Sequence, residues 1–283
     1  MLYRIYLKKL KTMNILSLFD GISCGQIALN RADIKYNKYF ASEIEKSAIN
    51  ITQKNFPNTV QLGDVTKVKA SDLPQIDLLI GGSPCQGFSF AGKQLNFEDP
   101  RSALFFEFVR LMEECKPKYF LLENVVMKKE FEDVITQHMG VKPILINSNL
   151  VSAQNRKRLY WTNIPNIQQP EDKNIKMSDI LLSGQHIIVS NQKKTHKPGG
   201  DKSATLLARD YKGFGNQQMS GVMDNGNIRM LTPVEYERLQ NVPDNYSSTT
   251  SNTQRYKMLG NGWTVGVIEH IFKNMEYECI ESI

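Results

Sequence analysis

The sequence predicts an α/β protein built on a doubly wound, mostly parallel sheet. Short apolar runs alternate with segments of helical periodicity from Asn14 to Thr162, the order expected of strands joined by crossover helices. A glycine or an acidic residue follows most of these runs, as is common where parallel strands end at a ligand crevice. The chain has 283 residues, of which 41% are hydrophobic, so it can bury an ample core.

The elements of this sheet are expected in a regular order. Strands are expected at residues 14–19, 39–42, 60–62, 76–80, 119–122, 142–146 and 158–162, and helices at 25–32, 45–55 and 102–115. Continuous apolar residues predict the buried strands, whereas apolar residues three or four positions apart predict the helices. Gly81 and Gly82 are expected to close the fourth strand in a turn, and Glu123 is expected to follow the fifth.

The chain changes character after Thr162. Residues 163–228 are polar and glycine-rich, which predicts an irregular second lobe with strand character only at 187–189 and 204–207. Helices are expected again at 233–240 and 265–275. We therefore expect one domain of residues 1–162 plus 256–283 and a second of residues 163–255.

The net charge of +6 is a weaker signal than it looks. Four basic residues lie before Met13 with no acid among them, namely Arg4, Lys8, Lys9 and Lys11. Since the first strand begins near Met13, residues 1–12 are expected to be an optional extension, or alternatively a flexible basic tail that contacts phosphates. Global charge alone therefore does not establish a nucleic-acid partner.

Cysteine usage and hydropathy suggest a cytoplasmic protein. The four cysteines show neither CxxC nor Cys/His ligand spacing, so they predict reduced intracellular thiols and no metal site. No apolar run approaches the length of a membrane span, and residues 1–12 lack the features of a signal peptide. We expect no membrane partner.

Polar residues at the ends of the expected strands predict a nucleoside site. Glu43 follows the second strand and Asp64 the third, where one acid can accept two ribose hydroxyls and the other an adenine amino proton. The first turn lacks the GxGxxG pattern, which disfavours a dinucleotide. Cys85 follows the fourth strand in the tetrad Ser83-Pro84-Cys85-Gln86, placing a thiol in the same crevice. Each acid alone also has an ordinary alternative as a turn or cap residue.

Several short motifs follow one another along the chain. They are 19–25 (FDGISCG), Glu43, 63–65 (GDV), 84–89 (PCQGFS), 123–125 (ENV), 154–158 (QNRKR), 229–240 and 260–262 (GNG) with Val267. From Asn14 onward the chain resembles the DNA cytosine-C5 methyltransferases, in which these motifs occur in the same order. The first motif is most similar to that of the animal de novo enzymes, whereas the whole is similar to bacterial and phage modification enzymes. Two positions depart from the family: Asn241-Val242 stands where Gly-Phe is usual, and Gly262-Trp263 where Ser and a small apolar residue are common.

The resemblance implies a Rossmann-like fold, S-adenosylmethionine as cofactor, S-adenosylhomocysteine as product, no metal, and a recognition role for residues 163–255. It implies cofactor contacts at Phe19, Asp20, Gly21, Ile22, Ser23, Cys24, Gly25, Glu43, Ile44, Asp64, Val65, Pro84, Asn261, Gly262 and Val267. It implies catalytic roles for Cys85, Glu123, Arg156 and Arg158. It implies DNA contacts at Gln86, Ser89, Gln154, Thr205, Leu206 and Arg209.

The expected reaction is methylation of a cytosine flipped out of duplex DNA. Cys85 would add to C6, Glu123 would hydrogen-bond N3, and Arg158, with Arg156 more weakly, would bond the base O2. The segment 87–100 would close over the base. We expect a monomer on double-stranded DNA, with a restriction endonuclease as cognate partner. The alternatives are a tRNA cytosine-C5 methyltransferase and an inactive DNA-binding homologue.

Overall fold

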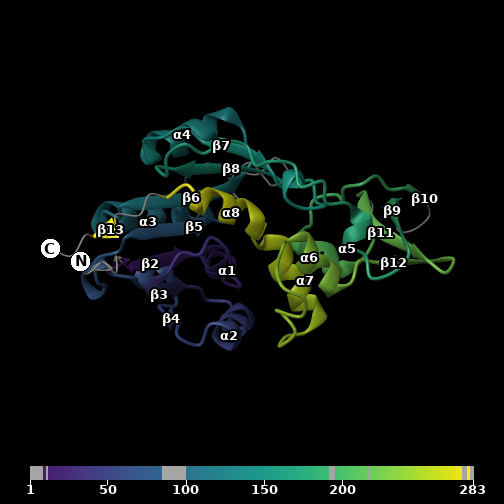
Figure 1. Ribbon diagram of the computed structural model, residues 1–283, viewed down its shortest axis with the longest axis horizontal. Helices are drawn as coiled ribbons and strands as arrows, with labels where there is room; N and C mark the ends of the chain where they lie inside the picture. The colour runs from purple at the N-terminus through teal and green to yellow at the C-terminus, as the bar shows by residue number, and fades with distance from the viewer. Residues whose placement is uncertain are drawn as a thin grey trace, which may run out of the picture.

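The computed structural model describes residues 9–10, 12–84, 100–190, 195–215, 217–275 and 279–280. These residues form a seven-stranded sheet, a four-stranded sheet and a two-stranded ribbon (Figure 1). The ribbon pairs β1 (Lys9–Leu10) with β13 (Cys279–Ile280), two segments far apart in the sequence. Cys85, Gln86, Ser89 and nearly all of the segment expected to close over the base lie outside the described residues.

The large sheet has the order β4-β3-β2-β5-β6-β8-β7. Its strands are β2 (Met13–Leu18), β3 (Tyr36–Ser42), β4 (Val60–Gln61), β5 (Leu78–Gly82), β6 (Tyr119–Val125), β7 (Ile144–Asn147) and β8 (Lys157–Thr162). Only β8 runs antiparallel to its neighbours, so the doubly wound, mostly parallel sheet is confirmed. The strand order reverses between β2 and β5, and ligands bind at such a switch point in open α/β sheets.

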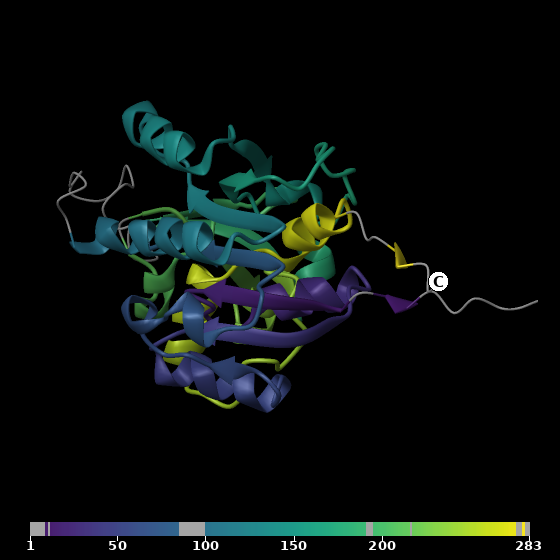
Figure 2. The same cartoon turned by 90° about the vertical axis from the view of Figure 1, so that its left-hand side faces the viewer.

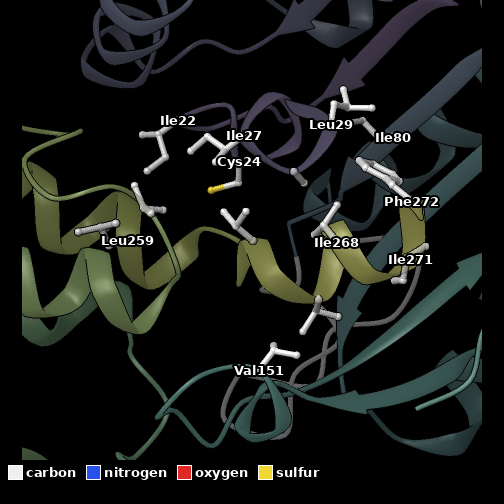
Figure 3. Close-up of a cluster of buried hydrophobic side chains, with 14 of the residues drawn as sticks. Ile22, Cys24, Ile27, Leu29, Ile80, Val151, Leu259, Ile268, Ile271 and Phe272 are labelled. Atoms are coloured by element: carbon white, nitrogen blue, oxygen red, sulfur yellow. The ribbon is translucent and has the colours of Figure 1, made fainter. Parts of the chain in front are cut away.

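Two helical layers cover this sheet, as Figures 1 and 2 show. The first contains α1 (Cys24–Arg31), α2 (Lys46–Asn55) and α8 (Val265–Phe272), and the second contains α3 (Pro100–Cys115) and α4 (Lys129–Met139). Successive strand residues alternate between the two cores: Ile15 lies in the first and Leu16 in the second. Cys24 lies inside the first core beside Ile22, Ile27 and Leu259 (Figure 3).

The second lobe is more regular than the sequence predicted. β9 (Gln185–Ser190), β10 (Thr195–Pro198), β11 (Met219–Asp224) and β12 (Asn227–Met230) form an antiparallel sheet, with α5 (Met177–Ile180), α6 (Pro233–Leu239) and α7 (Asn252–Asn261) beside it (Figure 1). Asn225 and Gly226, with φ of 47° and 79°, make the tight turn between β11 and β12. An Asn-Gly pair is a strong hairpin signal, and it was overlooked. The strand expected at 204–207 is wrong, because the Leu206 N–H bonds the Gln154 side chain instead of a neighbouring strand.

The large sheet also corrects the sequence analysis. Gly81 and Gly82 lie within β5, not in a turn after it, and Glu123 lies within β6. A Cβ on Gly81 would lie 3.1 Å from the Phe108 ring, so this glycine serves packing rather than turning. Helix α4, which the sequence analysis missed, buries Phe131, Ile135 and Met139 at four-residue intervals.

Candidate functional site

The first loop of the site, between β2 and α1, is held by Glu43 at the end of β3. The Glu43 carboxylate accepts hydrogen bonds from three backbone amides: Gly21 at 2.8 Å through Oε2, and Ile44 and Glu45 at 2.8 Å through Oε1. Gly21 has a φ of 59°, and a Cβ there would meet nothing within 4 Å. One carboxylate therefore fixes both loops at the switch point and leaves open space above the glycine.

Asp20 is the half-buried acid of this loop. Its Oδ1 accepts from the Tyr39 hydroxyl at 2.7 Å, and its Oδ2 accepts from the Ser23 hydroxyl. Burial raises the pKa of Asp20 from 3.8 to about 6, against the lowering effect of these hydroxyl donors, and the neighbouring Glu43 charge raises it further. Neutral donors thus compensate only part of the cost of burying this charge.

The third strand end adds a second carboxylate and an apolar surface. Asp64 Oδ1 accepts from the Thr66 amide at 3.0 Å and the Thr66 hydroxyl at 2.9 Å, which lowers the Asp64 pKa. Its Oδ2 has no partner among the described residues. Ile44, the residue after Glu43, is 73% exposed. Glu43 and Asp64 offer carboxylates, and Ile44 offers an exposed apolar side chain. This combination fits a nucleoside, because its ribose offers hydrogen-bond donors and its base offers a flat face.

The approach to Cys85 is fixed by the next strand. Asn124 Nδ2 donates to the Ser83 hydroxyl at 3.1 Å, and both residues are buried. Asn124 Oδ1 accepts a hydrogen bond from the Val125 backbone amide at 2.8 Å, which orients the side-chain amide of Asn124. Ser83, with the Pro84 that follows it, is thereby held against β6 immediately before the thiol-bearing segment.

Glu123 receives a donor on each carboxylate oxygen. Arg158 Nε lies 2.9 Å from Oε1, and Trp263 Nε1 donates to Oε2 at 3.1 Å. The Glu123 and Arg158 side chains are only 11% and 13% exposed, so the pair is well shielded from solvent. β6 pairs with β8 so that Val125 lies opposite Arg158, which puts Arg158 diagonally across from Glu123. A cavity of about 440 Å³ opens beside Arg158 and is lined by Val125, Val126, Asn147, Asn155, Lys157, Arg158 and Thr205.

Arg156 and Gln154 brace the backbone around this cavity. Arg156 is 4% exposed and donates to the carbonyls of Leu206 at 3.0 Å, Gly260 at 3.1 Å and Gly262 at 3.0 Å. Gln154 is fully buried, and its Oε1 accepts from the Leu206 amide at 3.0 Å. These bonds join β8 to the second lobe and to the segment between α7 and α8.

Comparison with known proteins identifies this arrangement. The model of the C-5 cytosine-specific DNA methylases matches residues 13–198 and 173–277. The chain belongs to this family. It is 32% identical to the type II methyltransferase M1.ScrFI of Lactococcus lactis subsp. cremoris, over 95% of this chain and 79% of that protein. It is 28% identical to M.HhaI of Haemophilus parahaemolyticus, over 95% of each.

Solved structures share the fold at lower identity. The Entamoeba histolytica methyltransferase EhMeth superposes with a TM-score of 0.74 at 19% identity, covering 93% of this chain and 98% of that chain. DNMT2 of Spodoptera frugiperda gives 0.71 at 20% identity, covering 93% and 99%. The chain is thus a DNA cytosine methyltransferase by family, on a Rossmann-like methyltransferase fold.

The structure gathers most of the residues that the sequence singled out for this methyltransferase. Phe19 to Ser23, Glu43, Ile44 and Asp64 lie in loops and turns at or near the carboxyl ends of β2, β3 and β4. Cys24 and Gly25 begin α1, Val65 begins a short 3-10 helix, and Val267 is buried in α8. Thr205 lines the cavity and Arg209 is exposed on the second lobe. Leu206, expected to contact DNA, is 2% exposed and packs in the core.

The described residues contain no helix with the length and apolar character needed to cross a membrane. They also contain no cluster of three or more His, Cys, Asp or Glu side chains arranged to hold a metal.

Asn241, one of the two departures from the family, has a backbone explanation. Its φ is 56°, a conformation that glycine adopts freely and asparagine tolerates best among other residues. Asparagine therefore keeps the turn that the usual glycine would make. The other departure, Trp263, contacts Glu123, which the sequence analysis did not foresee; a large aromatic in place of a small residue was the available signal.

Proposed function

We propose that this protein methylates C5 of a cytosine flipped out of double-stranded DNA, through a covalent bond between the Cys85 sulfur and C6. The observation that carries the proposal is the Glu123 carboxylate, held on β6 by Arg158, which itself lines a cavity. The adjacent Asn124 anchors Ser83, two residues before Cys85. The strand that carries the assigned base-binding acid is thus hydrogen-bonded to the residue two positions before the assigned nucleophile.

Each step assigns work to a residue of this chain. The Cys85 thiolate adds to C6, and the displaced ring electrons make C5 nucleophilic toward a methyl group. The Glu123 carboxyl group donates the proton that it carries to N3 as negative charge builds on the ring, and its other oxygen accepts from the exocyclic amine. Uracil presents a donor at N3 and an oxygen at position 4, so the same contacts select cytosine. A base then removes the C5 proton, and the returning electron pair expels the Cys85 thiolate.

The cofactor site is assigned to the loops around Glu43. Bound S-adenosylmethionine supplies the methyl group and leaves as S-adenosylhomocysteine. Glu43 and Asp64 would bind the ribose and the adenine amino group, while Ile44 would cover the base face. The open space above Gly21 lets a ligand approach the backbone. Pro84, Asn261 and Gly262 would form the rim of this site.

Arg156 is assigned a positioning role, because its guanidinium donates to three carbonyls around the cavity. Arg158 is the arginine placed to contact the base as well as Glu123. Residues 163–255 would form the target-recognition domain, with Thr205 and Arg209 as DNA contacts. Because the matched relatives are type II methyltransferases, we assign the protein to restriction-modification or phage self-protection, acting as a monomer beside a cognate endonuclease.

A cysteine comparison tests this function. Cys85→Ser should abolish transfer of labelled methyl groups to unmethylated genomic DNA while leaving calorimetric binding of S-adenosylhomocysteine nearly intact. Cys115→Ser is the matched control, since this half-buried thiol on α3 should be dispensable. Appreciable methylation by the Cys85 variant would contradict the mechanism. Methylation of tRNA in preference to duplex DNA would contradict the assigned substrate.

A further inference from the structure

Trp263 lies between the two halves of the site. Its backbone amide hydrogen-bonds the thiol of Cys24, and its ring lies 3.8 Å from where a Cβ on Gly25 would be. These two residues begin α1 and end the motif at residues 19–25, which is called the cofactor loop below. Its indole Nε1 donates to Glu123 Oε2 at 3.1 Å, on the opposite side of the crevice. One residue thus contacts the cofactor loop through its backbone and the catalytic carboxylate through its side chain.

Gly82 of β5 makes room for this contact. A Cβ there would lie 2.9 Å from Glu123 Oε2 and 2.9 Å from Trp263 Nε1, closer than real Cβ atoms come to such groups. In the parallel register Gly82 pairs with Glu123, so its bare backbone faces the indole–carboxylate pair. Gly82 therefore leaves the space that the large side chain of Trp263 needs to reach Glu123.

We infer that Trp263 is a positioning residue for methyl transfer, which orients the Glu123 carboxylate and links that orientation to the cofactor loop. The inference rests on the proposed role of Glu123. A single donor, Arg158 Nε on Oε1, leaves the carboxylate free to turn about that bond. A second donor on Oε2 fixes the carboxylate plane, so less ordering remains to be done when the base arrives.

Matched tryptophan variants test this inference. Trp263→Phe keeps an aromatic ring but removes the N–H, whereas Trp161→Phe removes an N–H that donates to Thr136 at 2.9 Å in the buried core. We expect Trp263→Phe to lower kcat about tenfold, as losing one hydrogen bond to a charged group would, with KM for DNA and cofactor within about twofold. Trp161→Phe should lower Tm and leave kcat within about twofold.

Fluorescence gives a readout that does not depend on turnover. The chain has two tryptophans, so the Trp161→Phe protein reports Trp263 alone. Should that variant fail to fold, the difference between the wild-type and Trp263→Phe spectra supplies the same signal. Adding Glu123→Gln should shift the Trp263 emission, and S-adenosylhomocysteine should change it without DNA, because the backbone of Trp263 contacts the cofactor loop.

The outcomes separate the inference from the proposed function. Wild-type kcat for Trp263→Phe, or Trp263 emission indifferent to Glu123→Gln, would overturn the positioning role while leaving the proposed function intact. Full turnover by Glu123→Gln would overturn the proposed function itself. A loss confined to cofactor KM would make Trp263 a cofactor contact and contradict its action on Glu123.

Discussion

Asp20 and Glu123 are two shielded carboxylates of one crevice, and they are held by different kinds of donor. Glu123 accepts from the Arg158 guanidinium and the Trp263 indole. Asp20 accepts from the hydroxyls of Tyr39 and Ser23, and burial raises its pKa to about 6. The difference lies in the compensation of the two carboxylates: Glu123 is paired with a guanidinium cation, whereas the donors to Asp20 are neutral hydroxyls that offset only part of the cost of burial.

Removing Arg158 should have the largest effect on this comparison. Arg158→Ala leaves Glu123 shielded without its cationic partner, so we expect methylation to fall at least about a hundredfold and unfolding free energy to drop by about 3 kcal/mol. Urea titration and methyl-transfer kinetics measure the two effects. Arg158→Lys keeps the charge and should recover most of the stability. Unchanged turnover in the alanine variant would show that the ion pair does not serve catalysis.

Neutralising Asp20 should stabilise the protein at high pH. Because the pKa of Asp20 is raised from 3.8 to about 6 by folding, its contribution to stability is fully present below about 3.8 and is lost as pH rises through about 6. Asp20→Asn should therefore gain up to about 3 kcal/mol over wild type at pH 8, a gain that shrinks toward pH 4. Urea unfolding across this range measures it. Cofactor affinity should fall in the same variant.

Asp64→Asn is the matched control for this prediction, since hydrogen bonds to Thr66 lower the Asp64 pKa. The contribution of Asp64 to stability is present above its usual pKa and is lost as pH falls, so the Asn variant should lose stability at pH 8. Equal stability changes at Asp20 and Asp64 would remove the distinction between the two carboxylates.

Crowding Gly82 should disturb only the base side. Gly82→Ala brings a Cβ to 2.9 Å from both Glu123 Oε2 and Trp263 Nε1, which we expect to cost about 1–3 kcal/mol of stability and to lower turnover. Gly200→Ala is the control, because a Cβ there meets nothing within 4 Å. Thermal unfolding and kinetics compare the two variants. A Gly82→Ala enzyme as active as the control would contradict the tight packing of the pair.

The smallest expected effect concerns Tyr39. Tyr39→Phe removes the hydroxyl that donates to Asp20 Oδ1, so the Asp20 pKa should rise further and the variant should lose about 1 kcal/mol at pH 8. The loss should be smaller at pH 4, where Asp20 is more often protonated. Parallel urea titrations at the two values measure the difference, and a loss independent of pH would assign the hydroxyl a packing role only.

The sequence was most informative where one local pattern decides the structure. Apolar runs and strand-end acids predicted the sheet and placed Glu43 and Asp64 in its loops, because parallel strands bring their carboxyl ends together. The sequence predicted the role of a residue wrongly where that role depends on a contact with residues far away in the chain. Gly82 looked like a turn residue, and only the packing of Glu123 and Trp263 against it shows why a strand carries a glycine there.

The predicted roles of individual side chains were also less accurate where distant contacts determine them. Arg156 and Arg158 lie two residues apart in the same motif. Arg156 donates to backbone carbonyls, whereas Arg158 pairs with Glu123. Their residue type could not separate these roles, because the partners come from segments up to 106 positions away. Leu206 was expected at the DNA but is buried, since local sequence does not reveal which face of a loop turns inward.

The central claim is that Cys85 forms a covalent bond to a cytosine in duplex DNA. The most direct measurement is a denaturing gel of the protein incubated with S-adenosylmethionine and mixed-sequence duplex DNA in which 5-fluorocytosine replaces cytosine. Fluorine takes the place of the C5 proton and cannot be removed by a base, so the bond between Cys85 and C6 is not broken after methyl transfer. The wild-type protein should therefore migrate as a stable protein–DNA complex, and Cys85→Ser should not. No complex with the wild type, or an equal complex with the serine variant, would contradict the account.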